Sequence, residues 1–138
     1  MTTYLLDTNV VCEATSKQPN PRVLAWCTKH AARSVLSCVT LGEIWKGIHL
    51  MPEGRRRASL AAWAAGIERD FSDVILPLES KTLKAWGQFY AMHESHGLNM
   101  SVLDSLIAAT ALVHGLTIAT RNLADFPPDV RTLNPWDS

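Results

Sequence analysis

The sequence has no excess of charge of either sign. It holds 13 Lys and Arg residues against 13 Asp and Glu residues, so its formal net charge at pH 7 is zero. Proteins that coat nucleic acid through bulk electrostatics carry a strong positive balance, and this class is therefore excluded. An enzyme that holds nucleic acid locally is not excluded, because a zero total can hide an acidic pocket set among basic residues.

Cysteine is scarce as well. Cys12, Cys27 and Cys38 are odd in number, are widely spaced and form no CxxC pair. This pattern excludes the common zinc and redox motifs, and it is typical of proteins from a reducing compartment. We therefore expect a cytoplasmic protein.

Long hydrophobic runs are also missing. The first ten residues, MTTYLLDTNV, contain no basic segment followed by a long apolar one, so no secretory signal is expected. The longest apolar stretch, LIAATALVHGLTIAT at 106–120, is interrupted by His114 and Gly115 and is too short to cross a bilayer. We expect a soluble protein without a membrane partner.

What is present fits one domain, residues 1–138. Apolar residues make up 47% of the chain and charged residues 19%, which supports a core and argues against disorder. Apolar runs of strand length alternate with helical patterns. We expect strands at 3–7, 34–39, 73–78 and 116–120, an edge strand at 132–133, helices at 8–14, 21–31, 40–50, 55–71, 79–96 and 101–114, and a helical turn at 122–125.

This alternation predicts an α/β fold with a mostly parallel central sheet of four to five strands, covered by helices on both faces. The stripe of the helix at 55–71 is expected to hold Leu60, Trp63, Ala64, Ile67 and Phe71. The inward side chains of the helix at 79–96 are expected to be Leu83, Trp86, Phe89, Tyr90 and His93. The helix at 101–114 is apolar on almost every side and should be central, with Gly115 as its end.

Four acidic residues follow the expected strands. Asp7, Glu43, Asp104 and Asp125 each come just after a strand or near the start of the helix that follows it. Ligands of parallel sheets bind beyond the carboxyl ends of the strands, so all four acids should lie at one rim. The five histidines lie within or at the ends of expected helices and are interpreted as packing or surface residues, so no Ser-His-Asp or Cys-His arrangement competes.

Each acid also has an ordinary structural explanation. Asp7 is equally consistent with a cap of the short helix that follows it, and Asp125 with a turn residue. Thr40 and Glu43 match a capping box in which Thr40 caps the helix.

The third acid has a similar alternative. Ser101 and Asp104 match a capping box with Asp in place of Glu. Asp104 is nevertheless the only charge on a nearly apolar helix, so it must be hydrated, paired or bound to metal.

The four acids together predict a metal site. Without cations they would repel and raise one another's pKa, and oxygen ligands suit Mg²⁺ or Mn²⁺ rather than zinc. One or two such ions would support hydrolysis of a phosphodiester.

At this point the sequence resembles a known family. LLDTNV, TLGEIWKGI, AWGQF, LDSLIAATALVHGLTIATRNLADF and LNPW resemble the PIN domain, and more narrowly the VapC-type toxins of bacterial toxin–antitoxin pairs, in the FitB-like subgroup. The resemblance covers residues 4–136. It implies a three-layer α/β/α fold, an endoribonuclease dependent on Mg²⁺ or Mn²⁺, homodimers and a cognate antitoxin. The family's acidic set falls on Asp7, Glu43, Asp104 and Asp125.

The resemblance also implies polar neighbours for this acidic set. Thr8, Asn9 and Thr120 would hydrogen-bond water or phosphate, and Arg121 and Asn122 follow at the same rim. Many relatives carry Pro and Arg shortly before the third acid, where this chain reads NMSVL at 99–103, so RNA contacts there are not carried over.

Several cationic and aromatic residues stay open at this stage. Arg121 is consistent with a phosphate contact or with a pair to a carboxylate such as Asp125. The run Arg55, Arg56 and Arg57 is either an RNA clamp or, more simply, a solvated face. Three tryptophans are consistent either with core packing or with a contact to a partner: Trp26, Trp45 and Trp136.

Two other functions compete with the ribonuclease. The first is a phosphatase or dehalogenase in which Asp7 is the nucleophile, but the common phosphatase pattern has a second Asp where this chain has Asn9. The second is a catalytically inactive module that only binds antitoxin or RNA, and the presence of all four acids argues against it.

Overall fold

The computed structural model describes residues 1–138 and contains one five-stranded parallel sheet in the order β3-β2-β1-β4-β5. The strands are β1 (Tyr4–Leu6), β2 (Ser34–Ser37), β3 (Ile75–Leu76), β4 (Thr117–Ala119) and β5 (Thr132–Leu133). β1 lies in the middle, and its Leu5 is in register with Val35 on one side and Ile118 on the other. The predicted parallel sheet is therefore confirmed.

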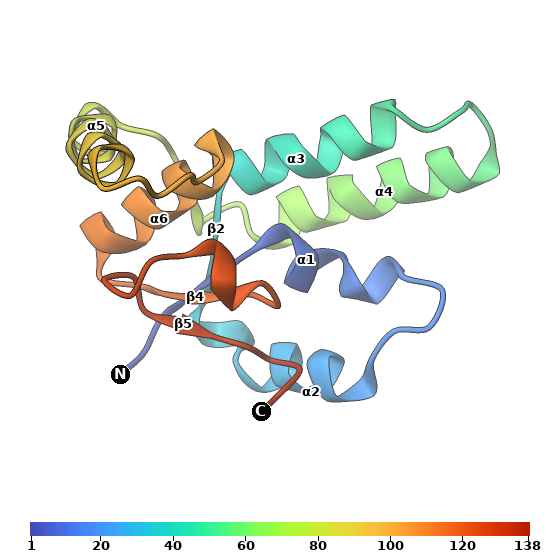
Figure 1. Ribbon diagram of the computed structural model, residues 1–138. Coiled ribbons are helices and arrows are strands. Elements are labelled where there is room, and N and C mark those ends of the chain that lie inside the picture. Colours follow the sequence, from blue (N-terminus) through green and yellow to red (C-terminus); the bar gives the residue numbers. More distant parts are fainter.

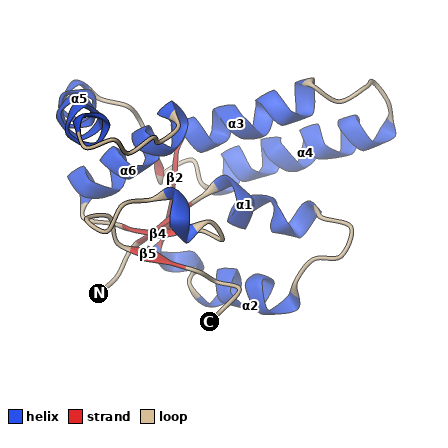
Figure 2. Cartoon of the chain, in the orientation of Figure 1, coloured by secondary structure: helices blue, strands red, loops and turns tan.

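The helices cover both sides of this sheet in a three-layer α/β/α arrangement (Figure 2). They are α1 (Thr8–Val11), α2 (Pro21–Lys29), α3 (Cys38–His49), α4 (Arg55–Asp70), α5 (Ser80–Ser95) and α6 (Val102–His114). Three short 3₁₀ turns, η1 (Cys12–Thr15), η2 (Ala31–Arg33) and η3 (Leu123–Asp125), complete the chain. None of these helices combines the length and the apolar composition that a membrane-spanning segment requires.

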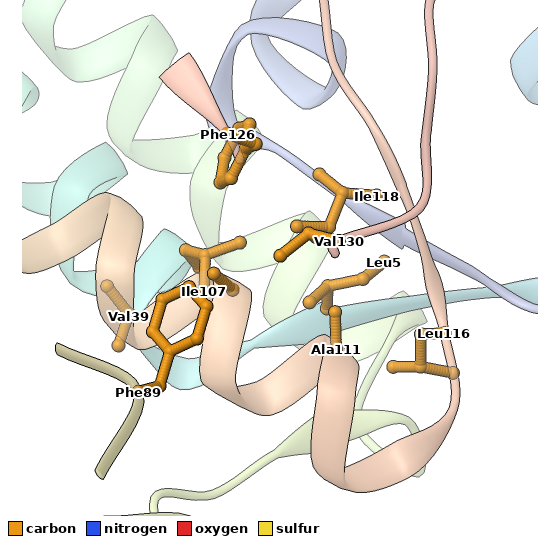
Figure 3. Packing of buried hydrophobic residues seen from close by; sticks show 10 residues of the cluster. Leu5, Val39, Phe89, Ile107, Ala111, Leu116, Ile118, Phe126 and Val130 are labelled. Atoms are coloured by element: carbon orange, nitrogen blue, oxygen red, sulfur yellow. The ribbon is translucent and has the colours of Figure 1, made fainter. Parts of the chain in front are cut away.

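Two hydrophobic clusters lie on opposite faces of the sheet because side chains alternate along each strand. Leu5 and Ile118 belong to the cluster under α5 and α6, where Figure 3 shows them beside Ile107 and Ala111 of α6. Their neighbours Leu6 and Ala119 belong to the cluster under the other helices. The alternation holds β1 and β4 between two layers, so the residues that follow them are placed firmly.

The start of α3 differs from the prediction. The helix begins at Cys38, and the hydroxyl of Ser37 rather than that of Thr40 caps it by accepting a hydrogen bond of 3.0 Å from the Val39 N–H. β2 ends earlier than its apolar run because the Ser37 side chain satisfies the first free N–H groups of a helix. Thr40 is consequently inside the helix and fully buried.

The inward face of α5 also differs from the prediction. Phe89 and His93 are buried as expected, but Thr82 is fully buried where Leu83 was expected, and Leu83 is 43% exposed. Trp86 and Tyr90, which were also expected to point inward, are half-buried, so the inward face of the helix is turned toward Thr82 and away from Leu83. On α6 the central role is confirmed, although Leu112 is 43% exposed.

Single residues explain where one strand and one helix end. β3 covers only Ile75–Leu76 of the expected 73–78, because Pro77 has no N–H to continue the ladder. α6 ends at Gly115, whose backbone is left-handed (φ 65°), as the sequence predicted.

Candidate active site

Asp7 is the first residue after the central strand. Its backbone N–H still donates to the Ala119 carbonyl of β4 at 2.9 Å, which fixes the Cα position at the carboxyl edge of the sheet. Its side chain is only 7% exposed, and Oδ1 accepts from the Thr8 N–H at the start of α1. Asp7 is therefore both the cap of α1 and a buried carboxylate at the edge where ligands bind.

The second oxygen of Asp7 accepts hydrogen bonds from two other segments of this edge. Thr120, at the end of β4, donates its hydroxyl proton to Oδ2 at 2.8 Å, and the Asn9 amide donates to the same atom at 3.3 Å. Thr120 is fully buried, and its Oγ1 in turn accepts from the Asn122 N–H. These bonds fix the orientation of the Asp7 carboxylate.

Glu43 lies in the second turn of α3 and faces the same region. Its Oε1 accepts a hydrogen bond of 2.9 Å from the Thr8 hydroxyl. Because Ser37 caps α3, the capping-box interpretation of Glu43 is wrong. Its second oxygen has no protein partner and is free for water or a ligand.

Asp104 lies in the first turn of α6. The predicted cap is confirmed, because the Ser101 hydroxyl accepts from the Asp104 N–H at 3.1 Å. The Asp104 carboxylate is half-buried and faces the cavity near Asp7. The cap and the acidic site therefore share one location.

Asp125 is an exposed residue of η3, and Arg121 before it does not pair with it. The only ion pair of the chain joins His93 and Asp129 at 3.3 Å. The Arg121 guanidinium lies 5.0 Å from the ring centre of Trp136 instead, and its backbone N–H donates to Oδ1 of Asn9. The alternative of an Arg121–Asp125 pair is wrong, and Arg121 keeps its charge free at the rim.

All four predicted acids line one cavity of about 550 Å³. The lining comes from α1, α3, η3 and the start of α6, which meet beyond the strands (Figure 1). The other residues that line it are Thr8, Asn9, Cys12, Ser101, Val102, Leu103 and Asn122. Of the nine predicted site residues, Thr120 and Arg121 do not line the cavity, although both bond to residues that do.

Four lining residues were not predicted as site residues: Cys12, Ser101, Val102 and Leu103. Of these, Ser101 was predicted only as a helix cap. Cys12 comes one helical turn after Thr8, and this spacing was the only signal available. Burial, with a smaller contribution from Glu43, raises the pKa of the Cys12 thiol to about 11, so it stays neutral at physiological pH.

Burial and neighbouring negative charges act together on two of the acids. Burial raises the pKa of Glu43, and the negative charges of Asp7 and Asp104 raise it further, while the hydrogen bond from Thr8 lowers it. Burial likewise raises the pKa of Asp104, with additional contributions from Asp7 and Asp125. Four carboxylates gathered in this way favour a cation at neutral pH.

The donor set fits a hydrated divalent cation. As placed, no three His, Cys, Asp or Glu side chains are close enough to hold one ion jointly. Mg²⁺ usually keeps several waters and is bound through one or two carboxylates, and a cavity with mutually repelling oxygens suits this mode. Zinc is disfavoured because no histidine lines the cavity and Cys12 is its only thiol.

The three arginines at 55–57 lie away from this cavity. They begin α4, and none of them lines the acidic cavity. Arg56 donates to the Thr15 carbonyl at 2.7 Å and Arg57 contacts His49 at 3.2 Å. These contacts favour a structural and solvated role over an RNA clamp.

The tryptophans divide between core and partly exposed positions. Trp26 is buried in the core, while Trp45 is half-buried and donates to Glu68 at 2.7 Å. Trp86 donates to Ser105 at 2.8 Å, and Trp136 is half-buried beneath Arg121.

A three-layer α/β/α fold with a carboxylate-lined cavity beyond the central parallel strands defines the class of this protein. Comparison with known families narrows that class, because the PIN domain matches residues 4–126. The chain therefore belongs to the PIN-domain family.

Curated relatives match along nearly the whole chain. Plasmid stability protein StbB of Pseudomonas syringae pv. tomato is 35% identical, and the match covers 97% of this chain and 99% of StbB. Toxin FitB of Neisseria gonorrhoeae is 36% identical, with 96% of this chain and 97% of FitB covered. VapC ribonuclease Y4jK of Sinorhizobium fredii is 30% identical, and the match covers 96% of this chain and 97% of Y4jK.

Solved structures agree with this membership. The crystal structure of FitAcB from Neisseria gonorrhoeae contains a chain with 34% identity and a TM-score of 0.90, and the match covers 99% of this chain and 100% of that one. The structure of FitAB bound to a DNA fragment gives a TM-score of 0.89 at the same identity, and the match covers 97% of this chain and 96% of that one.

Proposed function

We propose that this chain is the toxin of a toxin–antitoxin pair and acts as a metal-dependent endoribonuclease. The observation that carries the proposal is the single cavity into which Asp7, Glu43, Asp104 and Asp125 converge from separate segments of the chain. Relatives named Toxin FitB and VapC ribonuclease support the same activity.

In this proposal one or two Mg²⁺ or Mn²⁺ ions would be held by four acids, directly or through water: Asp7, Glu43, Asp104 and Asp125. When bound, such an ion acidifies the attacking water and stabilises negative charge on the scissile phosphate. Asp7 would be the main contributor, because it is the most buried of the four and its negative charge raises the pKa of both Glu43 and Asp104.

The surrounding residues orient the carboxylates and the substrate. Thr8, Asn9 and Thr120 donate to the acids and hold them in place despite their repulsion. The free oxygen of Glu43 is available to accept a proton or a hydrogen bond from water in the cavity. Arg121 and Asn122 at the rim supply hydrogen bonds to phosphate.

The phosphatase alternative has little support. Both oxygens of Asp7 accept hydrogen bonds, and one of the donors is Asn9, at the position where a phosphatase would have its acid. A neutral amide is too weak an acid to protonate a leaving group, so this site suits phosphodiester hydrolysis better.

The proposal includes two protein partners, an antitoxin and a second copy of this chain. The antitoxin is inferred from the relative named Toxin FitB, and it would act in the cytoplasm by placing a basic side chain in the acidic cavity. The second copy is supported by one flank of α5, where Trp86 and Tyr90 line a surface depression. Leu83, which is 43% exposed, comes one helical turn before Trp86 on the same flank.

The homodimer is tested with two charge substitutions on α5. Leu83→Glu is expected to convert dimers to monomers in size-exclusion chromatography with light scattering. Met92→Glu is the matched control, because Met92 is 45% exposed but lies on the opposite flank of the helix. If Leu83→Glu remains dimeric, or if both variants dissociate equally, the dimer interface does not lie on the Leu83 flank of α5.

The activity is tested by cleavage of a labelled single-stranded RNA in Mg²⁺ or Mn²⁺. Asp7→Asn is expected to lower the rate at least about a thousandfold while leaving the circular dichroism spectrum unchanged. Asp70→Asn is the matched control, since Asp70 is exposed and lies outside the cavity. Cleavage that persists in excess EDTA, or equally in both variants, contradicts the proposal, and failure to bind Mn²⁺ in calorimetry favours an inactive binding module.

A further inference from the structure

A second surface, lined by cations, begins at the rim of the acidic cavity and runs along α2. Its first cation is Arg121, which follows the Thr120 that bonds to Asp7. The Arg121 guanidinium lies over Trp136, and the Trp136 carbonyl accepts a hydrogen bond of 3.3 Å from Arg22 at the start of α2. These contacts therefore connect the rim of the acidic cavity to α2, and the C-terminal segment lies beside that helix in Figure 1.

From Arg22 the same surface continues down one face of the helix. Arg22 and Lys29 are seven residues apart, which places them on one face and about 10 Å apart along the axis. Both line a cavity of about 410 Å³ between α2 and the C-terminal segment. A second cavity, of about 380 Å³, shares Lys29 with the first and adds Arg33.

No acidic side chain lines either of these cavities. Arg22, Lys29, Arg33 and Arg121 make no ion pair, because the only ion pair of the chain is elsewhere. A chain with zero net charge thus gathers four of its 13 acids in one cavity and leaves unpaired cations along the surface that leads from Arg121 down α2. This separation favours a ligand that carries a row of negative charges.

Aromatic rings accompany the cations along this surface. Tyr4 and His30 line both cavities, and their rings lie 5.2 Å apart between centres. His30 in turn stacks on Trp26 at 4.4 Å. Cationic grooves with aromatic rings are the usual way in which proteins bind a single nucleic-acid strand, since cations contact phosphates and rings stack with bases.

We propose that this surface, defined by Arg121, Arg22, Lys29 and Arg33, is a binding track for the single-stranded RNA that enters the acidic cavity. The inference rests on the ribonuclease function proposed above and extends it to the path of the substrate. The cavity binds the scissile phosphate, while the track binds the strand several nucleotides away. A long RNA therefore contacts both the acidic cavity and the track, whereas a short oligonucleotide in the cavity does not reach the track.

The track is tested by the double variant Lys29→Gln/Arg33→Gln, with binding measured in EDTA so that no cleavage is needed. Fluorescence anisotropy with a 20-nucleotide single-stranded RNA should give an affinity about fivefold to tenfold weaker than that of the unmodified protein. The slope of log affinity against log salt should fall by about 1.4, because two phosphate contacts are lost. A four-nucleotide RNA should show no difference.

The matched control is Arg55→Gln/Arg69→Gln, which removes two exposed cations from α4 and leaves the total charge the same as in the test variant. Equal RNA affinity in the two double variants, or an equal loss in both, overturns the track. Unchanged RNA affinity with weakened binding of polyglutamate assigns the surface to acidic protein and also overturns it. Loss of RNA affinity in a protein that never cleaves RNA would support the track and contradict only the proposed activity.

Discussion

The hydroxyl of Thr120 donates a hydrogen bond of 2.8 Å to Oδ2 of Asp7, although 113 positions separate the two residues in sequence. The bond joins the ends of the two central strands, and both side chains are buried. Asp7 would otherwise present an oxygen to the protein interior with only the more distant Asn9 amide as partner. The pair therefore links the stability of the sheet edge to the geometry of the acidic cavity.

We expect Thr120→Val to weaken both stability and activity. The substitution keeps the shape but removes a hydrogen bond to a buried charge, which should lower the free energy of unfolding by about 2 kcal/mol. RNA cleavage should fall at least about tenfold, because the Asp7 carboxylate loses its fixed orientation. Urea denaturation and single-turnover cleavage measure the two effects.

Thr120→Ser provides the control for this substitution. It keeps the hydroxyl and should retain most of the activity, even if the lost methyl group costs some stability. If Thr120→Val cleaves RNA as fast as the unmodified protein, the hydrogen bond has no part in orienting Asp7.

Much of this arrangement could be predicted from the sequence, because the signals were local and periodic. The apolar run before Asp7 and the apolar run before Thr120 indicated buried parallel strands, and parallel strands bring their carboxyl ends to one edge. The acids that follow such strands are then brought together whatever their separation in sequence.

The errors arose where two local patterns competed. Ser37 and Thr40 are both good helix caps, and only the length of β2 decides between them. The phase of α5 was set by packing against α6, which buries Thr82 and leaves Leu83 exposed. The contact of Arg121 with Trp136 depends on the tertiary path of the last residues, which no local pattern encodes.

We expect Asp104→Asn to stabilise the metal-free protein while it abolishes cleavage. Burial and the neighbouring acids raise the pKa of Asp104 in the folded state, so its charged form is disfavoured by folding. Removing that charge should raise the melting temperature in EDTA at pH 7 by roughly 1–3 °C, a modest effect because the site is partly open to solvent. Glu43→Gln should act in the same direction.

The same residues set the sign of the pH dependence. Because the folded-state pKa values of Asp104 and Glu43 are raised, the protonated forms of these side chains favour the folded state. This contribution to stability is complete below the ordinary pKa values of 3.8 and 4.5, and it is lost as the pH rises through the raised values. The difference in melting temperature between Asp104→Asn and the unmodified protein should therefore shrink as pH falls from 7 toward 4. A difference that is independent of pH would exclude charge repulsion as its cause.

Addition of Mg²⁺ is expected to reverse the repulsion. An ion that binds only the folded state at ten times its dissociation constant stabilises that state by about 1.4 kcal/mol. Mg²⁺ should thus raise the melting temperature of the unmodified protein, and Asp7→Asn should lose this increase. Asp70→Asn should keep it, and an equal increase in all three proteins would indicate a general salt effect.

A final prediction concerns Thr40, whose Oγ1 is buried without a hydrogen-bond partner. Thr40→Val keeps the β-branched shape and replaces the unpaired hydroxyl by a methyl group, so it should raise the free energy of unfolding by about 1 kcal/mol. Thr110→Val is the matched control, because Thr110 is equally buried in a helix but donates to the Leu106 carbonyl at 2.8 Å. Urea denaturation should show a gain for Thr40→Val and no gain for Thr110→Val. Because Thr40 does not line the acidic cavity, RNA cleavage should stay unchanged, and a loss of stability in Thr40→Val would mean that its hydroxyl binds a buried water.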